Sequence, residues 1–412
     1  MRKATMIKPE SLATRFSPLD PSFVNDPYPV YAALREHDPV HRSHLGCWVL
    51  TRYKDVVDAL RDPRLSNEPS PYAVIHRRNR ERYTAADVAN NILPFMDPPA
   101  HTIARGLVNR SFRAHLKGTP PDIQGIADRL LDPLMAKGEL DVVNDFGTPL
   151  SLAVIAQLLG MPERDGDRLK EWSNWFFYLF SAIPSDEVLD NMNRALDEFR
   201  KYVLSLVHER RKVRRDDLIS KLLDAREGDA RLSEAQLVDT CMLLFADGVE
   251  NVDSGIGSSL VCLLENPAIL ARVRDDPELI PSAIEESLRI NPPGQFIAKI
   301  AKEEIALGDR TIRRNDVVLL VLASANRDAA CFENPDEFRL DRPNGQHLGL
   351  GKGRHSCLGA PLVRMEMNAA LRTLIGRLDG LTVEDSAPEW EARVGHRWLN
   401  SLPVSFTPCH GT

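Results

Sequence analysis

The residues with the clearest chemical potential lie between Gly349 and Met367, in the run GLGKGRHSCLGAPLVRMEM. Three glycines at alternate positions, two basic residues and a histidine lead into one cysteine, Cys357, and an apolar pattern of helical spacing follows it. Free N–H groups and the positive end of the dipole at a helix start favour a thiolate over a thiol. Gly351, Gly353 and Gly359 leave room for a backbone or a flat ligand near the sulfur. The pattern predicts a loop that presents a thiolate.

Several uses of such a thiolate can be compared from the residues alone. A nucleophilic cysteine needs a base from elsewhere in the fold, and nothing local identifies one. Zinc would need two further ligands besides Cys357 and the neighbouring His355. The phosphate-cradling pattern GxxxxGK[ST] is absent from the sequence. Axial ligation of haem iron remains, a role in which thiolate electron donation favours O–O cleavage.

The composition describes an ordinary globular chain of 412 residues, 43% hydrophobic and 27% charged. A net charge of −7 gives no reason to expect nucleic acid as a partner. The first residues lack the apolar core of a signal peptide, and the longest apolar runs are shorter than the ~20 residues of a membrane span. We expect a soluble cytoplasmic protein with no membrane span and with free, scattered thiols at Cys47, Cys241, Cys262, Cys331, Cys357 and Cys409.

The elements that must position Cys357 are mostly helical. PYPVYAALREH, YKDVVDALRD and residues 122–210 show apolar spacing of 3.6 residues, whereas CWVLTRY, IAKIAKEEIAL and DVVLLVLAS have the pattern of strands. No linker-like tract and no repeat interrupts the chain. We predict a single domain over residues 1–412, mostly α with a small segregated β-sheet region, an α+β fold.

Three motifs carry a resemblance to a known family. LGKGRHSCLGA, residues 350–360, resembles the cysteine-loop signature of the cytochrome P450 family, written FGxGxHxCxGxxLA in bacterial members. EESLR resembles the family's ExxR motif, with Glu286 and Arg289 on one helical face. ENPDEFRLDRP resembles the meander segment, in which Arg342 would join that pair as a third structural residue.

A further segment, MDPPAHTIAR, resembles the family's DPPxHxxxR, in which His101 and Arg105 would hold a haem propionate. The resemblance covers nearly the whole chain and implies a cytochrome P450 fold over residues 1–412. It implies haem b (iron protoporphyrin IX) between a long distal helix at about 234–265 and a cysteine-loop helix at about 357–376. The cofactor-binding residues carried over are His101, Arg105, Lys299, Leu350, Gly351, His355, Cys357 and Gly359, with Cys357 as the metal ligand.

The oxygen-handling segment departs from the family pattern (A/G)Gx(D/E)T. The capping box of Ser233 and Gln236 predicts that a long helix starts there. Within it the catalytic positions read Asp247, Gly248, Glu250 and Asn251. An amide has no hydroxyl proton to pass on, so Asn251 differs chemically from the usual threonine. One interpretation is tolerated drift with a water in place of the hydroxyl; the other is altered oxygen activation, or a substrate group bound by Asp247.

Two other positions depart from the family, and the substrate pocket is specified only by analogy. Leu350 replaces a phenylalanine, and Lys299 replaces an arginine common in bacterial members, keeping the charge without the fork geometry. An apolar to moderately polar small organic substrate is expected. The predicted pocket residues are Leu93, Phe95, Trp175, Phe176, Phe180, Gln295, Phe296, Ile297 and Trp398.

The resemblance implies a monooxygenase that uses O2, with electrons from a separate ferredoxin and its reductase. Six basic residues are expected to form a docking patch for an acidic ferredoxin: Arg105, Arg110, Arg113, Lys352, Arg354 and Arg364. Three alternatives remain open, namely a peroxide-driven peroxygenase, a haem-thiolate isomerase or reductase, and a non-catalytic haem-binding module.

Overall fold

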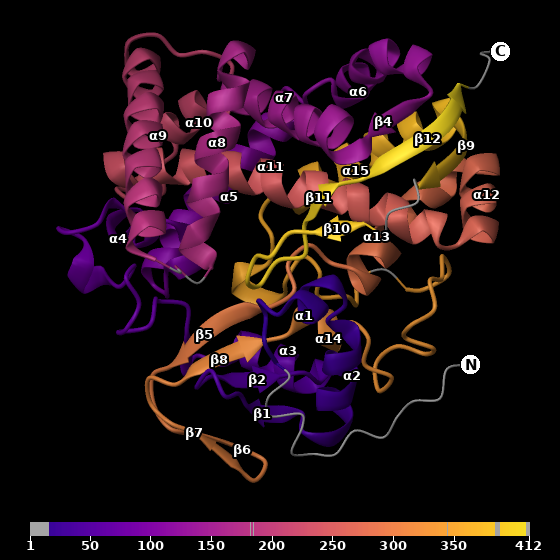
Figure 1. Ribbon diagram of the computed structural model, residues 1–412. Coiled ribbons are helices and arrows are strands. Elements are labelled where there is room, and N and C mark those ends of the chain that lie inside the picture. The colour runs from indigo at the N-terminus through magenta and orange to yellow at the C-terminus, as the bar shows by residue number, and fades with distance from the viewer. Residues whose placement is uncertain (1–15, 182, 184, 344, 384–387, 409–412) are drawn as a thin grey trace.

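Helices fill the upper part of the molecule in Figure 1, and the largest sheet lies below them with α2 and α3 beside it. The structure is a computed structural model that describes residues 16–181, 183, 185–343, 345–383 and 388–408. The fold agrees with the predicted class, mostly α with a small β region. Cys409 lies outside the described residues.

The helices are α1 (Pro21–Asn25), α2 (Tyr28–His37), α3 (Tyr53–Arg61), α4 (Thr84–Ala89), α5 (Ala100–Gly118), α6 (Ile123–Leu131), α7 (Thr148–Leu159), α8 (Gly166–Phe176), α9 (Asp186–Lys212), α10 (Leu218–Asp224), α11 (Glu234–Leu264), α12 (Pro267–Asp275), α13 (Ile280–Ile290), α14 (Leu322–Ala325) and α15 (Ala360–Arg377). Shorter helical turns used below are η2 (Arg77–Asn79), η3 (Leu93–Phe95), η5 (Val142–Gly147), η7 (Phe177–Phe180) and η9 (Gly353–His355).

The strands are β1 (Val40–Arg42), β2 (Trp48–Leu50), β3 (Leu65–Ser66), β4 (Glu139–Asp141), β5 (Ile297–Ala301), β6 (Ile305–Leu307), β7 (Arg310–Ile312), β8 (Val317–Leu320), β9 (Leu378–Val383), β10 (Glu389–Trp390), β11 (Leu399–Ser401) and β12 (Pro403–Pro408). A five-stranded sheet has the order β1-β2-β8-β5-β3, in which only β2 and β8 run parallel. The sheet joins strands from residues 40–66 with strands from residues 297–320. The other sheets are β4-β12-β9 and the hairpins β6-β7 and β10-β11.

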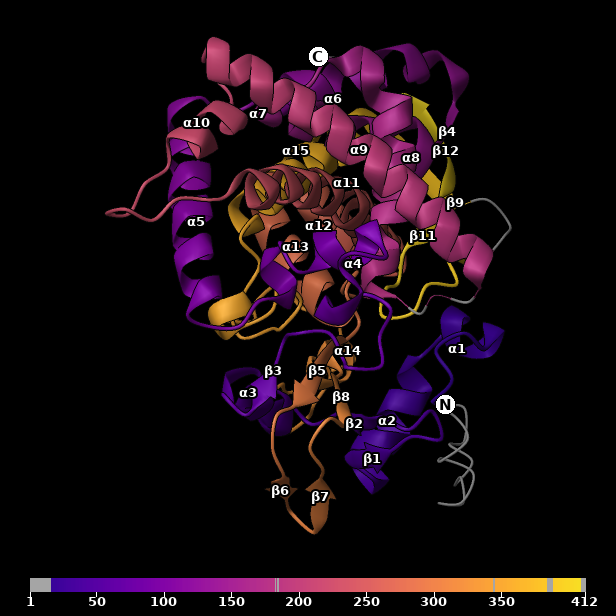
Figure 2. The same cartoon turned by 90° about the vertical axis from the view of Figure 1, so that its left-hand side faces the viewer.

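Helix α11 runs through the centre of the helical part and packs against α7, α8, α9, α13 and α15 (Figure 2). It begins at the predicted capping box, where Ser233 Oγ accepts from Gln236 N and Gln236 Oε1 accepts from Ser233 N. Its 31 residues give a length of about 46 Å. Most of its side chains are buried on all sides, as expected of a central helix.

Two expected boundaries need correction. The cysteine-loop helix begins at Ala360, three residues after Cys357, because Pro361 suits the first turn and Gly359 caps it. The expected turn region GDRTIRRND contains a short strand, β7, because residues 310–312 pair with β6.

Among the described residues, one helical stretch, Val142–Leu159, is long and apolar enough to cross a membrane. The bent pair α11 and α12 would count only if taken as one span. Of the Val142–Leu159 window, 67% is buried inside the protein, where η5 and α7 pack on α11. The core helices of water-soluble proteins pass the same test, so this is weak evidence for a span.

Candidate functional site

The segment of residues 349–359, here called the cysteine loop, is held by its own backbone. Cys357 N donates to Leu350 O at 2.7 Å, and Gly351 N donates to Leu348 O at 2.8 Å. Gly351 and Gly353 have φ angles of 68° and 80°, a region that side chains with a Cβ rarely adopt. These two glycines therefore allow the tight turns that deliver Cys357 to the end of the loop.

The Cys357 side chain has accessible surface, but it lies deep in the protein, where it is shielded from bulk water. Burial, with the nearby charge of Asp247, raises the pKa of Cys357 to about 11, and the Gly359 N–H offsets this only in part. Because α15 starts three residues after Cys357, the sulfur lies outside the first helical turn that was expected to favour a thiolate. Binding of a metal would have to displace the thiol proton.

The neighbours of Gly359 and Gly349 show which of the two positions needs a glycine. A Cβ on Gly359 would lie 3.9 Å from Cys357 Sγ, an ordinary contact, so this glycine is not needed to keep the chain clear of the sulfur. A Cβ on Gly349 would overlap the carbonyl oxygen of Leu288 in α13. This second constraint has no local signal in the sequence, because the packing of α13 against the loop creates it.

We expect Gly349→Ala to lower the free energy of unfolding by about 1–3 kcal/mol, because the added methyl forces the loop away from α13. Gly376→Ala in α15 is the matched control, since nothing lies within 4 Å of its added Cβ and alanine favours a helix. Thermal unfolding of both variants measures the difference. Equal melting temperatures would contradict this account of Gly349.

A cluster of basic groups lies beside the cysteine loop. His101 and His355 pack with ring centroids 4.0 Å apart, and each has a buried Nε2 with no hydrogen-bond partner within the described part of the chain. Burial and the neighbouring charges lower the pKa of His101 to about 4 and that of His355 to about 3. Those charges come from Arg105, Arg354 and Lys299.

Five basic groups with two unpartnered ring nitrogens form a receptor for anions. A carboxylate accepts hydrogen bonds, and it offsets the mutual repulsion of these side chains. The two propionates of haem are carboxylates, so the residues present fit that group. Arg105 also donates to Ser356 O at 2.6 Å, which ties α5 to the cysteine loop.

Lys299 is buried on β5 and reaches the same cluster. Its Nζ donates to Asn67 Oδ1 at 2.8 Å, and Asn67 N in turn donates to Asp97 Oδ1 at 3.0 Å. Burial, outweighing the attraction of Asp97, lowers the pKa of Lys299 to about 8. Asn67 and Asp97 were not among the predicted site residues, because they only approach Lys299 through the pairing of β3 with β5.

Asp247 of α11 shares an interior space with Cys357. Its side chain is accessible, yet burial within the protein raises its pKa to about 7, and its charge affects the thiol of Cys357. Asn251 lies one turn further, and its Nδ2 donates to Asp247 Oδ1 over a long 3.5 Å. Trp398 Nε1 donates to Asn251 Oδ1 at 3.3 Å, so the indole orients the amide. The structure thus brings Asp247, Asn251 and Cys357 together.

Glu250 points in another direction. Its carboxylate accepts from Lys170 Nζ and from Ser173 Oγ of α8, both at 2.8 Å, and the residue is 3% exposed. Lys170 also lies 3.5 Å from Asp253, so one lysine serves two carboxylates. Burial raises the pKa of Glu250, and Lys170 offsets only part of that effect. Lys170, Ser173 and Asp253 were missed because their link to Glu250 depends on the packing of α8.

Gly248 does not face the site as expected. A Cβ at this position would lie 2.8 Å from Ile155 Cγ1 of α7. Its lack of a side chain allows α7 and α11 to approach closely, so packing explains the glycine.

The predicted aromatic pocket is present in part. Phe95 of η3 stacks on Phe180 of η7 with centroids 5.0 Å apart. Phe177, which was not predicted, joins Phe180 to Trp398 through ring contacts of 5.6 and 4.9 Å. This aromatic group therefore reaches Asn251 through Trp398.

The other predicted pocket residues pack elsewhere. Leu93 and Phe176 are buried in the main core, and Trp175 stacks on Tyr178. Gln295 and Phe296 line a small cavity against the N-terminal segment, where Phe296 contacts Phe16. Ile297 packs on the core of the five-stranded sheet. The place of these residues in the pocket stays a prediction, because apolar spacing does not show which neighbour a side chain meets.

The ExxR residues and the meander arginine form one buried ionic network. Arg289 donates to both oxygens of Glu286 at 2.7 Å, and Arg342 Nε donates to Glu286 Oε1 at 2.8 Å. Arg289 also donates to three carbonyl oxygens, of Asn326, Pro335 and Glu337. The contact therefore ties α13 to the segment that precedes the cysteine loop.

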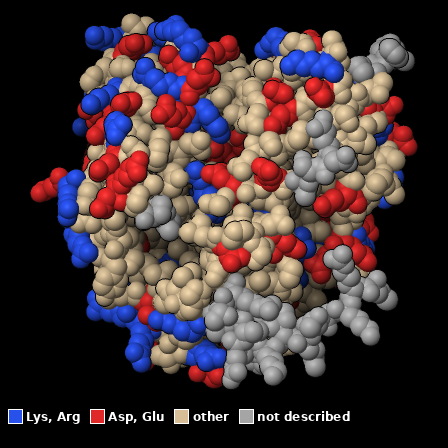
Figure 3. All heavy atoms as spheres, viewed as in Figure 1, with Lys and Arg blue, Asp and Glu red and all other residues tan. Residues whose placement is uncertain are grey.

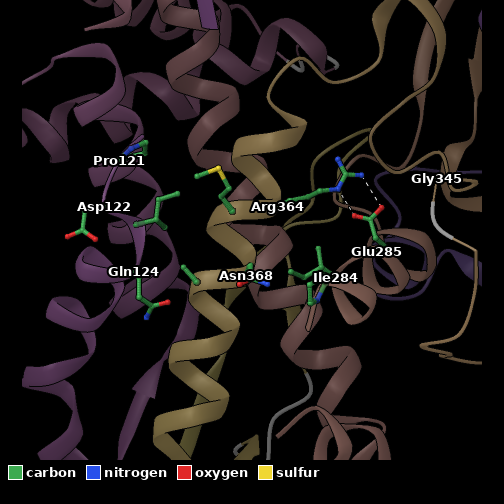
Figure 4. A pocket seen from close by; sticks show the side chains of 12 residues that line it. Pro121, Asp122, Gln124, Ile284, Glu285, Gly345, Arg364 and Asn368 are labelled. Atoms are coloured by element: carbon green, nitrogen blue, oxygen red, sulfur yellow. Dashed lines mark hydrogen bonds and ion pairs between the residues drawn. The ribbon is translucent and has the colours of Figure 1, made fainter. Parts of the chain in front are cut away.

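A groove of about 830 Å³ lies on the surface between α6, α13 and α15 (Figure 4). Arg364 crosses it to Glu285, with Nε and Nη2 donating to the two carboxylate oxygens at 2.6 and 2.9 Å. None of the predicted pocket residues lines this groove. It is thus separate from the space that Cys357 and Asp247 share.

The proteins to which this chain is similar belong to one family. The model of the family described as Cytochrome P450 matches residues 167–393. The chain is 32% identical to "Polyketide biosynthesis cytochrome P450 PksS" of Bacillus subtilis (strain 168), over 95% of this chain and 98% of that protein. It is 36% identical to "Mycinamicin IV hydroxylase/epoxidase" of Micromonospora griseorubida, over 91% and 94%. The solved structure of P450BioI with a hexadec-9Z-enoic acid-ligated acyl carrier protein matches with a TM-score of 0.87 at 33% identity, over 94% and 99%.

The fold, the cysteine loop and these matches define a haem-binding oxidoreductase of the monooxygenase type. The chain belongs to the cytochrome P450 family.

Proposed function

We propose that this protein uses O2 to insert one oxygen atom into a small organic substrate, with haem b held by the sulfur of Cys357. The observation that carries the proposal is the accessible thiol of Cys357, which shares an interior space with α11 beside a cluster of basic groups. The reaction converts a C–H or C=C bond, O2, two electrons and two protons into oxygenated product and water. When bound, the haem supplies the activation of oxygen.

The residues of the chain then have separate tasks. His101, Arg105, Lys299 and His355 would bind the propionates, which relieves their mutual repulsion. Leu350 and Gly351 shape the loop that carries Cys357. Glu250 holds or releases a proton next to Lys170, a residue whose side chain is 27% exposed. Asn251, fixed by Trp398, would hold a water where the family has a hydroxyl.

The domain boundaries and the cellular location are further parts of the proposal. We infer one P450 domain over residues 1–412, since the five-stranded sheet combines strands from residues 40–66 with strands from residues 297–320. A cytoplasmic location suits an enzyme that takes electrons from a carrier protein.

The identity of the oxidant is tested by measuring turnover of the wild-type protein with O2 and with peroxide in parallel. Product formed per NADH consumed, with a ferredoxin and its reductase, is compared with product formed per peroxide consumed. We expect the electron-driven reaction to be the more efficient. Efficient turnover with peroxide and poor turnover with every reductase would make a peroxygenase the better assignment, and the replacement of threonine by Asn251 is the observation that favours it.

Electron delivery would use the basic residues near the cysteine loop. Of the six proposed, Arg110 is paired with Glu227 and Arg364 with Glu285, and Arg105 donates to Ser356 O. Arg113, Lys352 and Arg354 have no carboxylate within 4 Å among the residues described, so they carry the uncompensated charge. Lys and Arg side chains are interspersed with Asp and Glu side chains over the face shown in Figure 3.

We expect the rate of reduction by an acidic ferredoxin to fall steeply as salt rises from ~0.05 to ~0.5 M, because the Debye length shortens from roughly 14 to 4 Å. Arg113→Glu should slow reduction roughly 10-fold at low salt and much less at high salt. Arg77→Glu, an exposed charge reversal on η2, is the matched control. Stopped-flow reduction measures both, and a rate independent of salt would exclude the patch.

A further inference from the structure

Asp247 is the exception among the acidic residues of α11. The helix contains five acidic side chains, and four of them have a basic partner within 4 Å. The paired ones are Glu234 with Arg211, Asp239 with Arg200, and Glu250 and Asp253 with Lys170. Within the described parts of the chain, Asp247 has no cation and only the long hydrogen bond from Asn251.

Three basic residues of the surrounding elements have other partners. Lys170 is held by Glu250 and Asp253 on the α8 side of the helix. Arg393 lies over the ring of Trp398 and pairs with Glu391 at 2.8 Å. Lys299 donates to Asn67. None of these three side chains, all in the described part of the chain, is therefore a counter-charge for Asp247.

An interior carboxylate without a cation is costly, and proteins usually pair or neutralise such a group. The pKa of Asp247, raised by burial to about 7, expresses that cost. Protonation relieves that cost in the free protein. A positively charged ligand relieves it as well, because it pairs with the ionised carboxylate in place of the water that the carboxylate loses.

The immediate surroundings also restrict the ligand. Trp398 orients the amide of Asn251, and Asn251 Nδ2 then points toward Asp247 Oδ1, which holds the carboxylate in place. The aromatic group that continues from Trp398 through Phe177 to Phe180 is apolar. An aromatic group linked to the carboxylate through Trp398 and Asn251 suits an alkylated ammonium group on an apolar body.

We infer that Asp247 binds a cationic nitrogen of the substrate, so that the substrate class is a small apolar amine in its protonated form. The inference rests on the proposed monooxygenase function, because it takes Asp247 to face the substrate once haem is held by Cys357. Trp398 and Asn251 act as positioning residues for the carboxylate.

The test compares permanent cations with their carbon isosteres. The probes are benzyltrimethylammonium with neopentylbenzene, and phenyltrimethylammonium with tert-butylbenzene, each measured by equilibrium dialysis against the haem-loaded protein. The measured quantity is the ratio of the dissociation constant of the neutral probe to that of the cation. These cations have no free electron pair on nitrogen and cannot coordinate iron, so binding reports on the carboxylate.

We expect Asp247→Asn to lower this ratio roughly 10- to 100-fold through loss of the opposite charge, since a quaternary ammonium group has no N–H to donate. Asp253→Asn removes the same charge from the same helix, but its carboxylate binds Thr148 and Lys170, so the ratio should stay unchanged. Trp398→Phe, which keeps a ring and removes the indole N–H, should lower the ratio by a smaller factor. A ratio that Asp247→Asn leaves unchanged, or cations that fail to bind the wild type, would overturn the inference.

The carbon monoxide difference spectrum of the same preparations distinguishes failure of the proposed function from failure of the Asp247 assignment. If the wild type lacks a thiolate-type spectrum, the proposed function itself fails. If the spectrum is present in the wild type and in Asp247→Asn while the ratio does not change, only the assignment of Asp247 fails.

Discussion

Replacing Cys357 with alanine should abolish the thiolate-type carbon monoxide difference spectrum of the reduced protein. Cys357 is the one cysteine that the tight turns of the loop deliver to the space shared with Asp247. Without its sulfur no thiolate is available there, and haem content should fall as well. The spectrum of purified, reduced protein measures both effects.

The other cysteines provide the controls. Cys47, Cys241 and Cys262 are buried, and burial raises the pKa of each thiol, which suits small core residues. Alanine variants of these residues, of the half-buried Cys331 and of Cys409 should keep the thiolate-type spectrum. If Cys357→Ala kept that spectrum and one of the other variants lost it, the assignment of the ligand would be wrong.

Glu250→Gln should slow O2-dependent turnover by roughly 10- to 100-fold, within or just below the range for general acid catalysis. The amide keeps the shape of the side chain and the contact with Ser173, but it removes the titrating group that lies beside Lys170. Poor proton delivery releases peroxide, so product formed per NADH consumed should also fall. Turnover and coupling measured together test both effects.

Two further variants separate proton transfer from structure. Ser173→Ala removes one hydrogen bond to Glu250 without removing the titrating group, so it should change turnover little. Asn251→Thr restores the hydroxyl of the family and should improve coupling or leave it unchanged. Equal coupling in the wild type and in Glu250→Gln would leave Glu250 as a structural acid that ties α8 to α11.

Local sequence patterns were sufficient for the class of the protein and for several contacts. The capping box at Ser233 and Gln236 marked the start of the long helix, which the structure places at residues 234–264. Glu286, Arg289 and Arg342 come together as predicted, because an i,i+3 pair shares a helical face and the meander returns to it. His101 and Arg105 lie one turn apart on α5 beside the cysteine loop.

Periodicity identified aromatic and apolar residues as interior without identifying their neighbours. Phe95 and Phe180 form a stacked pair as candidates for the pocket, but Gln295 and Phe296 pack on the N-terminal segment. Phe177, in the same aromatic run, makes the contact with Trp398 that the prediction did not include. The contacts of Phe177 with Trp398 and of Phe296 with Phe16 join residues more than 200 positions apart, and a local pattern contains no information about them.

By itself, the sequence determined the chemistry that the chain can offer: one cysteine in a glycine-bearing loop, the ExxR pair, and the replacement of a threonine by Asn251. The tertiary structure alone decided the direction of each side chain on α11. Neighbouring residues of a helix point about 100° apart, so the helices packed around α11 determine what each one meets. Glu250 therefore meets Lys170 of α8, Gly248 meets Ile155 of α7, and Asp247 is left facing the space shared with Cys357.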